Sequence, residues 1–169
     1  MSVIIEESNL LFGEYDESDI FRVEQSKVYK SLGANVRVVE FVLRHKNNEF
    51  ILIEAKSSSP KPGNQGDFDV FIDEITDKFI HTIDLYFSLI IKRLDDIEHE
   101  MPLGFKAADY SDAKIKLLLV INGHEIKWLP PISEALTMKL KRHIKTWRLD
   151  IGVINHEQAA EYGLLKQNI

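Results

Sequence analysis

The chain is organised around residues 36–59, which read VRVVEFVLRHKNNEFILIEAKSSS. Residues 36–43 are mostly apolar on both pleat faces, with Val36, Val38 and Val42 on one face, which is typical of a strand buried on both sides. Residues 50–53 form a second β-rich run, and the polar residues 44–49 between the two runs suit a turn. The pattern therefore predicts an antiparallel hairpin of residues 36–43 with residues 50–56.

Three charged residues lie on this predicted hairpin. The period of two along a strand puts Glu54 and Lys56 on one face, about 7 Å apart. A turn centred on Asn47 would place Glu40 opposite Glu54, whereas a register slip of one residue would send Glu40 to the other face. Directly opposed carboxylates are destabilising unless a positive group lies between them, and Lys56 or a divalent cation would serve.

An acid in one central strand, followed by hydrophobic-Glu-x-Lys in the next, resembles the PD-(D/E)XK nuclease superfamily. The motif residues here are Glu40 and then Glu54-Ala55-Lys56, with Glu in place of the usual first Asp. The resemblance implies a restriction-endonuclease-like fold and metal-dependent cleavage of phosphodiester bonds in DNA or RNA. It also implies catalytic roles for all three residues. Glu40 and Glu54 would bind Mg²⁺, or Mn²⁺ in its place, and Lys56 would position or activate the attacking water.

The superfamily often supplies a further Glu from an N-terminal helix, and the resemblance does not rank the candidates. They are Glu6, Glu7, Glu14, Glu17 and Glu24.

Length and composition bound the class of protein. A chain of 169 residues with 44% hydrophobic content suits one domain over residues 1–169. The absence of cysteine excludes a disulfide framework, a thiol nucleophile and a Cys-based zinc site. The start of the chain has no signal-peptide pattern and no run of 18 apolar residues occurs, so we expect a cytoplasmic protein that does not span a membrane.

Charge is distributed unevenly along the chain. The formal net charge is −6, yet residues 127–148 carry six Lys or Arg against one Glu. Such a stretch could follow nucleic-acid phosphates, although segregated charge is more often a solvated surface. Because an acidic chain binds nucleic acid weakly by itself, we expect a homodimer or a protein partner if nucleic acid is the ligand. The candidate nucleic-acid contacts are Lys61, Lys141, Lys145 and Arg148.

The remaining segments predict an α/β fold: a mixed central sheet that contains an antiparallel meander, flanked by helices. The expected strands are residues 3–5, 21–32, 115–121 and 150–155. The expected helices are residues 68–94, a helix that follows Pro130-Pro131, and a terminal helix or turn over 156–162. The expected loops are an acidic loop up to residue 20, residues 57–66 and residues 93–113.

Two hypotheses of function remain from the sequence. One is a metal-dependent nuclease or nuclease-like protein, and the other is a catalytically inactive protein of the same fold that acts as a binding module. Convergence of three acidic oxygens beside Lys56 would favour the nuclease. The six histidines show no metal spacing, and His124 alone lies near a strand end where it could line a site.

Overall fold

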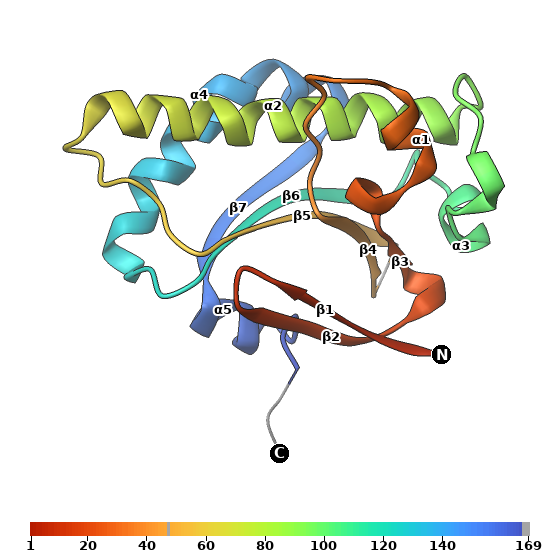
Figure 1. The fold of residues 1–169 in the computed structure, drawn as a ribbon, viewed down its shortest axis with the longest axis horizontal. Coiled ribbons are helices and arrows are strands. Elements are labelled where there is room, and N and C mark those ends of the chain that lie inside the picture. Colours follow the sequence, from red (N-terminus) through yellow and green to blue (C-terminus); the bar gives the residue numbers. More distant parts are fainter. Residues whose placement is uncertain (47, 167–169) are drawn as a thin grey trace.

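The computed structural model describes residues 1–46 and 48–166, and it has an α/β architecture (Figure 1). A five-stranded mixed sheet has the order β3-β4-β5-β6-β7, and β1 and β2 form a separate antiparallel pair. The strands are β1 (Ser2–Glu7), β2 (Leu10–Asp16), β3 (Ile20–Phe21), β4 (Phe41–His45), β5 (Glu49–Lys56), β6 (Lys114–Ile121) and β7 (Leu149–Asn155).

Two long helices and three short ones accompany the strands. The α-helices are α1 (Lys27–Ser31), α2 (Gln65–Ile90), α3 (Leu103–Lys106), α4 (Leu129–Trp147) and α5 (His156–Glu161). Short 3₁₀ turns lie at η1 (Glu17–Asp19), η2 (Val23–Gln25), η3 (Ile97–His99) and η4 (Ile126–Trp128).

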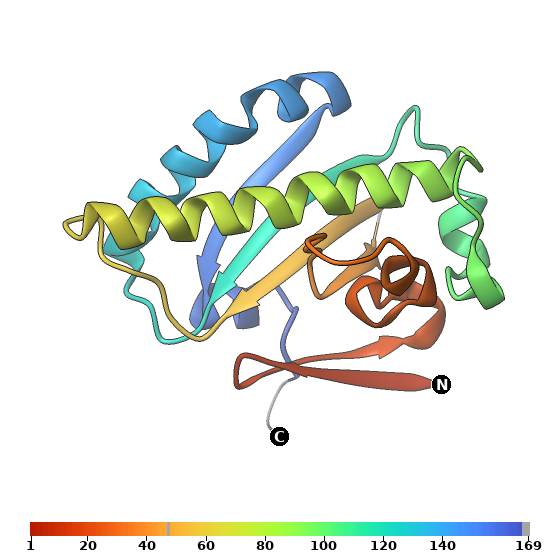
Figure 2. The ribbon, with the colours of Figure 1, turned by 45° about the horizontal axis from the view of Figure 1, so that its top comes forward.

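The five-stranded sheet is covered on both faces (Figures 1 and 2). Helices α2 and α4 lie on one face, where a large core includes Leu52, Ile75 and Leu136. The β1–β2 hairpin and α5 lie on the other face over a smaller core that includes Phe12 and Ile53. Burial on both faces explains why the central strands are apolar at nearly every position.

The predicted hairpin register is confirmed. Phe41 pairs with Ile53 and His45 with Glu49 in the antiparallel β4–β5 pair. Extending this register by one residue puts Glu40 opposite Glu54, and the Glu40 N–H donates a 3.2 Å hydrogen bond to the Ile53 carbonyl. The predicted turn centre, Asn47, lies outside the described residues.

The first predicted strand starts too early. Residues 36–40 are not strand, and β4 begins at Phe41. The Val39 N–H donates to the Thr82 hydroxyl of α2 at 2.9 Å instead of to a neighbouring strand. Val39 therefore belongs to the core on the α2 face, although strict alternation predicted the opposite face.

The prediction of a strand over residues 21–32 is wrong. Only Ile20–Phe21 is strand, and η2 and α1 follow. The Ser26 hydroxyl accepts a 3.2 Å hydrogen bond from the Tyr29 N–H and caps α1, as expected of serine at a helix start. The three-stranded antiparallel meander does exist, but its first strand has two residues.

The predicted acidic loop before residue 20 is also largely wrong. Residues Leu10–Asp16 form β2, which pairs antiparallel with β1. Ser8 and Asn9 both have positive φ at the turn between them, a conformation that asparagine tolerates well in two-residue hairpin loops. Exposed acids on the outer face of this separate hairpin explain why the sequence pattern resembled a loop.

The second half of the chain follows the prediction closely. Strand β6, helix α4, strand β7 and helix α5 lie where the sequence placed them, and α2 covers most of the predicted residues 68–94 but ends at Ile90. The predicted loop over residues 93–113 is wrong in part, because it contains η3 and the short helix α3. Trp147 at the end of α4 is 40% exposed and stacks on Phe87 with 4.3 Å between ring centroids. No helix of the described part of the chain is long and apolar enough to cross a membrane.

Candidate functional site

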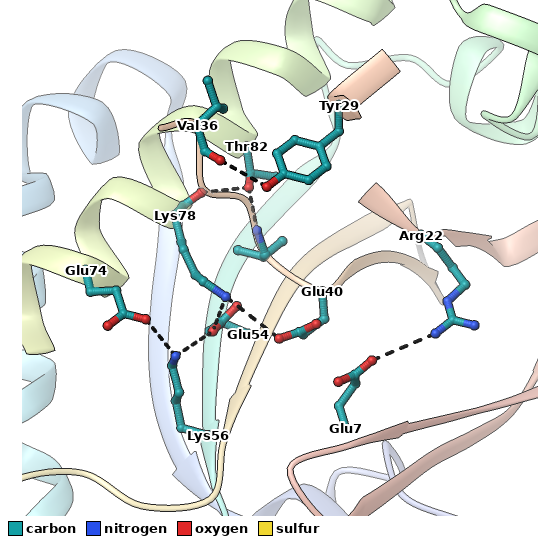
Figure 3. A network of polar contacts seen from close by, with 11 residues as sticks. Glu7, Arg22, Tyr29, Val36, Glu40, Glu54, Lys56, Glu74, Lys78 and Thr82 are labelled. Atoms are coloured by element: carbon teal, nitrogen blue, oxygen red, sulfur yellow. Dashed lines mark hydrogen bonds and ion pairs between the residues drawn. The ribbon is translucent and has the colours of Figure 1, made fainter. Parts of the chain in front are cut away.

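The two candidate acids meet at the carboxyl end of β5, on the sheet face that α2 covers (Figure 3). Alternation along β5 puts Glu54 on the same face as the core residue Leu52. The Glu54 side chain has no solvent exposure, and that of Glu40 is only 11% exposed. Two carboxylates are thus held opposite each other in largely dry surroundings.

A lysine that the sequence analysis did not single out lies between these carboxylates. Lys78 of α2 donates a 2.8 Å hydrogen bond to Glu54 Oε1 and lies 3.8 Å from Glu40 Oε1 (Figure 3). The Lys78 side chain is itself only 11% exposed. The positive group that two opposed carboxylates require is therefore Lys78, and not Lys56 as one of the expectations had it.

Lys56 lies at the open side of this cluster. Its ammonium group is 3.5 Å from Glu54 Oε1 and donates a 2.8 Å hydrogen bond to Glu74 Oε1 of α2. The Lys56 side chain is 25% exposed, so its charged end reaches water. The predicted shared face of Glu54 and Lys56 is confirmed, and Glu74 is an additional partner.

Two of the N-terminal candidates for a further acid reach the cluster. The Glu24 carboxylate of η2 lies near enough to Glu40 to raise the pKa of Glu40. Glu7 of β1 lies near enough to Glu24 and Lys78 for their charges to affect its pKa, and Arg22 pairs with it at 3.8 Å.

The other N-terminal acids are placed elsewhere or face solvent. Glu14 pairs with Lys166 at 3.4 Å, Glu17 lies in η1, and Glu6 is exposed.

Burial and the surplus of carboxylates together shift the pKa values of several residues in the cluster. Burial is the main reason that the pKa of Glu40 rises to about 8, and the neighbouring Glu24 and Glu54 raise it further. Burial likewise raises the pKa of Glu54 against the opposing effect of the Lys78 and Lys56 ammonium groups. Burial works to lower the pKa of Lys78, but the carboxylates of Glu54, Glu40 and Glu24 outweigh it and keep the pKa above its ordinary value.

The donor atoms suit a hard divalent cation in type. Glu54 Oε2 is buried and has no hydrogen-bond partner among the residues that the structure describes, so this carboxylate oxygen can accept a ligand bond. Mg²⁺ is often held by only one or two protein carboxylates, with water and substrate phosphate as its other ligands. Glu40 and Glu54 fit that role provided that Lys78 withdraws. Among residues 1–46 and 48–166, no three His, Asp or Glu side chains are grouped so as to hold a metal ion.

The loop that follows Lys56 packs on the connection between β6 and α4. The Ser59 hydroxyl is 2.9 Å from His124 Nε2, and the Asn155 amide donates to the His124 carbonyl at 3.0 Å. The Lys61 ammonium lies 5.0 Å from the centre of the Trp128 ring. His124 is thus buried in a structural contact near the end of β6, and Lys61 is the one predicted nucleic-acid contact on the loop that leaves Lys56.

The three predicted nucleic-acid contacts near the end of α4 are exposed, and the strand register places Arg148 away from the acidic cluster. Arg148 precedes Leu149, which pairs with Ile115, and Ile115 pairs with Phe50. Phe50 is six residues before Lys56, a separation of about 20 Å along a strand. Lys141 and Lys145 occupy the last two turns of α4 and face solvent.

A sequence signal for Lys78 did exist. The buried stripe of α2 includes Phe71, Ile75 and Thr82, and Lys78 continues the same spacing of three and four residues. A lysine at a core-facing position of an amphipathic helix requires a buried acidic partner. Glu74 lies four residues before Lys78. A Glu-Lys pair at this spacing is common on exposed helix surfaces, so it gives no sequence signal that Glu74 belongs to the site.

No protein-family model, curated protein or solved structure matches this chain.

Proposed function

We propose that this protein is a metal-dependent nuclease that acts on phosphodiester bonds of DNA or RNA. The observation that carries the proposal is the β4–β5 register, which puts Glu40 opposite Glu54 and leaves Lys56 on the same face. These are the residues through which the chain resembles the PD-(D/E)XK superfamily. An antiparallel meander that continues into α2 and a strand parallel to β5 supports a restriction-endonuclease-like fold.

The residues of the cluster have distinct roles under this proposal. Glu40 and Glu54 would hold Mg²⁺ or Mn²⁺, which when bound lowers the pKa of a water ligand and polarises the phosphate. Lys56 would orient the attacking water and stabilise negative charge that develops on the phosphate. Glu74 positions the Lys56 ammonium through its 2.8 Å hydrogen bond, because a charge-assisted bond restricts an otherwise flexible side chain.

Cleavage assays with Mg²⁺ and Mn²⁺ on single- and double-stranded DNA and on RNA test the proposal. Lys56→Ala should reduce the cleavage rate by about 10²-fold or more while it leaves folding nearly intact. Lys30→Ala on α1, where the lysine is exposed, is the matched control and should cleave at the wild-type rate. If the wild type cleaves none of these substrates and calorimetry detects no divalent binding, the nuclease proposal fails.

One observation favours a second candidate function. The ammonium group of Lys78 lies between the two opposed carboxylates and offsets part of their charge without a metal ion. In a catalytically inactive protein of the same fold, these ion pairs would only stabilise the structure and no metal ion would be required. Such a protein would serve as a binding module for a nucleic acid or a protein partner. In that case Lys56→Ala would leave partner binding unchanged.

A further inference from the structure

We propose that Lys78 is a built-in counter-ion that occupies the place of the divalent cation and holds the site closed until it moves from Glu54 to Glu74. The inference rests on the proposed function, because it concerns the regulation of the same site. Three side chains carry it: the buried Glu54, its partner Lys78, and Glu74 one helical turn before Lys78 (Figure 3).

The contacts of Lys78 show that it fills the position between the acids. Its ammonium group lies 2.8 Å from Glu54 Oε1 and 3.8 Å from Glu40 Oε1. The side chains of Lys78, Glu54 and Glu40 are each no more than 11% exposed. A buried ammonium group is tolerated only where carboxylates compensate the loss of hydration. Lys78 is therefore fixed by these acids in the metal-free protein.

An ammonium group and a divalent cation cannot share this position. Both would lie within a few ångströms of the same carboxylate oxygens, where like charges in a poorly solvated site repel strongly. Cation binding must therefore displace Lys78, and the intrinsic affinity of the acids for the cation is reduced by the stability of the Lys78 contacts. The free Glu54 Oε2 offers a first ligand before Lys78 has left.

The displaced ammonium group has a second partner within reach. Glu74 lies four residues before Lys78 on α2, which is the favourable orientation of a Glu-Lys pair along a helix. The hydrogen bond from Lys56 is the main reason that the pKa of Glu74 is lowered, and the charge of Lys78 adds a small further effect. The Glu74 side chain is 33% exposed, so a move from Glu54 to Glu74 takes the ammonium group from the interior toward water.

Calorimetry with Mn²⁺ as the only ligand measures the competition between the Lys78 ammonium group and the cation. The three proteins to compare are wild type, Lys78→Met and the control Lys30→Met. Met keeps most of the aliphatic stem but removes the charge. Lys78→Met should bind Mn²⁺ at least about tenfold more tightly than wild type, because a repulsive charge near the site is lost, and Lys30→Met should match wild type. Equal or weaker binding by Lys78→Met, or no binding by either protein, would overturn the inference.

The inference and the proposed function can fail separately. If only Lys78→Met binds Mn²⁺, Lys78 closes the site as inferred, but the wild type is not a metal-dependent nuclease. If wild type binds Mn²⁺ and Lys78→Met binds no better, the nuclease proposal stands and the inference falls.

A second measurement on the wild-type protein covers the case in which Lys78→Met does not fold. The ¹⁵N resonance of the Lys78 ammonium should be sharp in the metal-free protein, since the Glu54 hydrogen bond slows exchange with water. Saturation with Mg²⁺ should shift and broaden it, as the group moves toward solvent. A resonance that stays sharp and unshifted throughout the Mg²⁺ titration would overturn the inference.

Discussion

The Lys78 ammonium donates a 2.8 Å hydrogen bond to Glu54, a carboxylate with no solvent exposure. This contact joins the long helix α2 to the central strand β5 through charges and not through apolar packing. Removal of one partner from a buried pair leaves an uncompensated charge, at a cost of about 3–5 kcal/mol. The pair is therefore a constraint on folding as well as a part of the candidate site.

The first prediction concerns Glu54→Gln. From the sequence, removal of one of two opposed like charges should raise stability at neutral pH. The position of Lys78 reverses that expectation, because Gln would leave the buried ammonium group with Glu40 as its remaining close partner. Glu54→Gln should lower the free energy of unfolding in urea by about 3 kcal/mol. The double variant Glu54→Gln/Lys78→Met should lose less than the sum of the two single variants, and simple additivity would contradict the coupling.

The second prediction concerns the pH dependence of stability at Glu40. Because the pKa of Glu40 rises from 4.5 to about 8 on folding, the folded protein favours the protonated carboxyl. This contribution to stability is fully present below pH 4.5 and is lost as the pH rises through 8. The groups that face Glu40 are Glu24, Glu54 and Lys78.

Glu40→Gln removes that titration while it keeps a neutral hydrogen-bonding side chain. Its thermal midpoint should match wild type near pH 4.5, exceed it increasingly up to about pH 8, and exceed it by a constant margin from there to pH 9. Glu134→Gln on the exposed face of α4 is the control and should follow wild type throughout. A constant difference between Glu40→Gln and wild type across this pH range would show that the carboxyl does not titrate as described.

The central hairpin and its register were predictable from the sequence because both depend on residues that are close together in the chain. Apolar runs flank a polar turn, and burial of both faces makes a slip of one residue costly. The register could be extended to Glu40 and Glu54 without knowledge of any other element. The long helix was predictable for a similar reason, since its apolar stripe repeats over 26 residues.

Lys78 and Glu24 were not predicted as site residues, because their roles depend on how distant segments pack. Glu24 was one of five acids of equal rank until η2 was placed beside Glu40. The error over residues 21–32 has the same origin: alternation in Phe21 and Val23 suggested a strand, whereas the Ser26 cap begins a helix. Tertiary context and capping outweighed a weak periodic pattern.

The third prediction concerns Glu74 as a positioning residue. Glu74→Gln removes the charge that holds the Lys56 ammonium at 2.8 Å. If the protein is the proposed nuclease, the catalytic rate constant of cleavage should fall by about tenfold with little change in KM, because the orientation of Lys56 would matter most in the transition state. Asp73→Asn is the matched control, since the neighbouring Asp73 pairs at the surface with Lys139 of α4. Equal kcat values for the two variants would exclude a positioning role for Glu74.

The last prediction concerns the basic end of α4. Lys141 and Lys145 are exposed and lie toward the end of α4 that joins β7, where the strand register is about 20 Å from Lys56. A double variant with Ala at both positions should therefore weaken binding of nucleic acid without a change in kcat. Each lost phosphate contact should also reduce the slope of log Kd against log salt by about one.

The control for this surface is Lys30→Ala/Lys166→Ala, which removes the same charge elsewhere on the acidic chain. If both double variants weaken binding equally, the effect comes from the net charge and not from a defined contact surface. If only the α4 variant does so, its helix follows the phosphate backbone while the acidic cluster, at the far end of the sheet, meets the scissile bond. A nucleic acid bound in this way must reach from the acidic cluster to this part of α4, which the strand register places up to about 20 Å away, or about six base pairs of a duplex at 3.4 Å each. Substrates shorter than that should therefore lose affinity in the wild type to the level of the α4 variant.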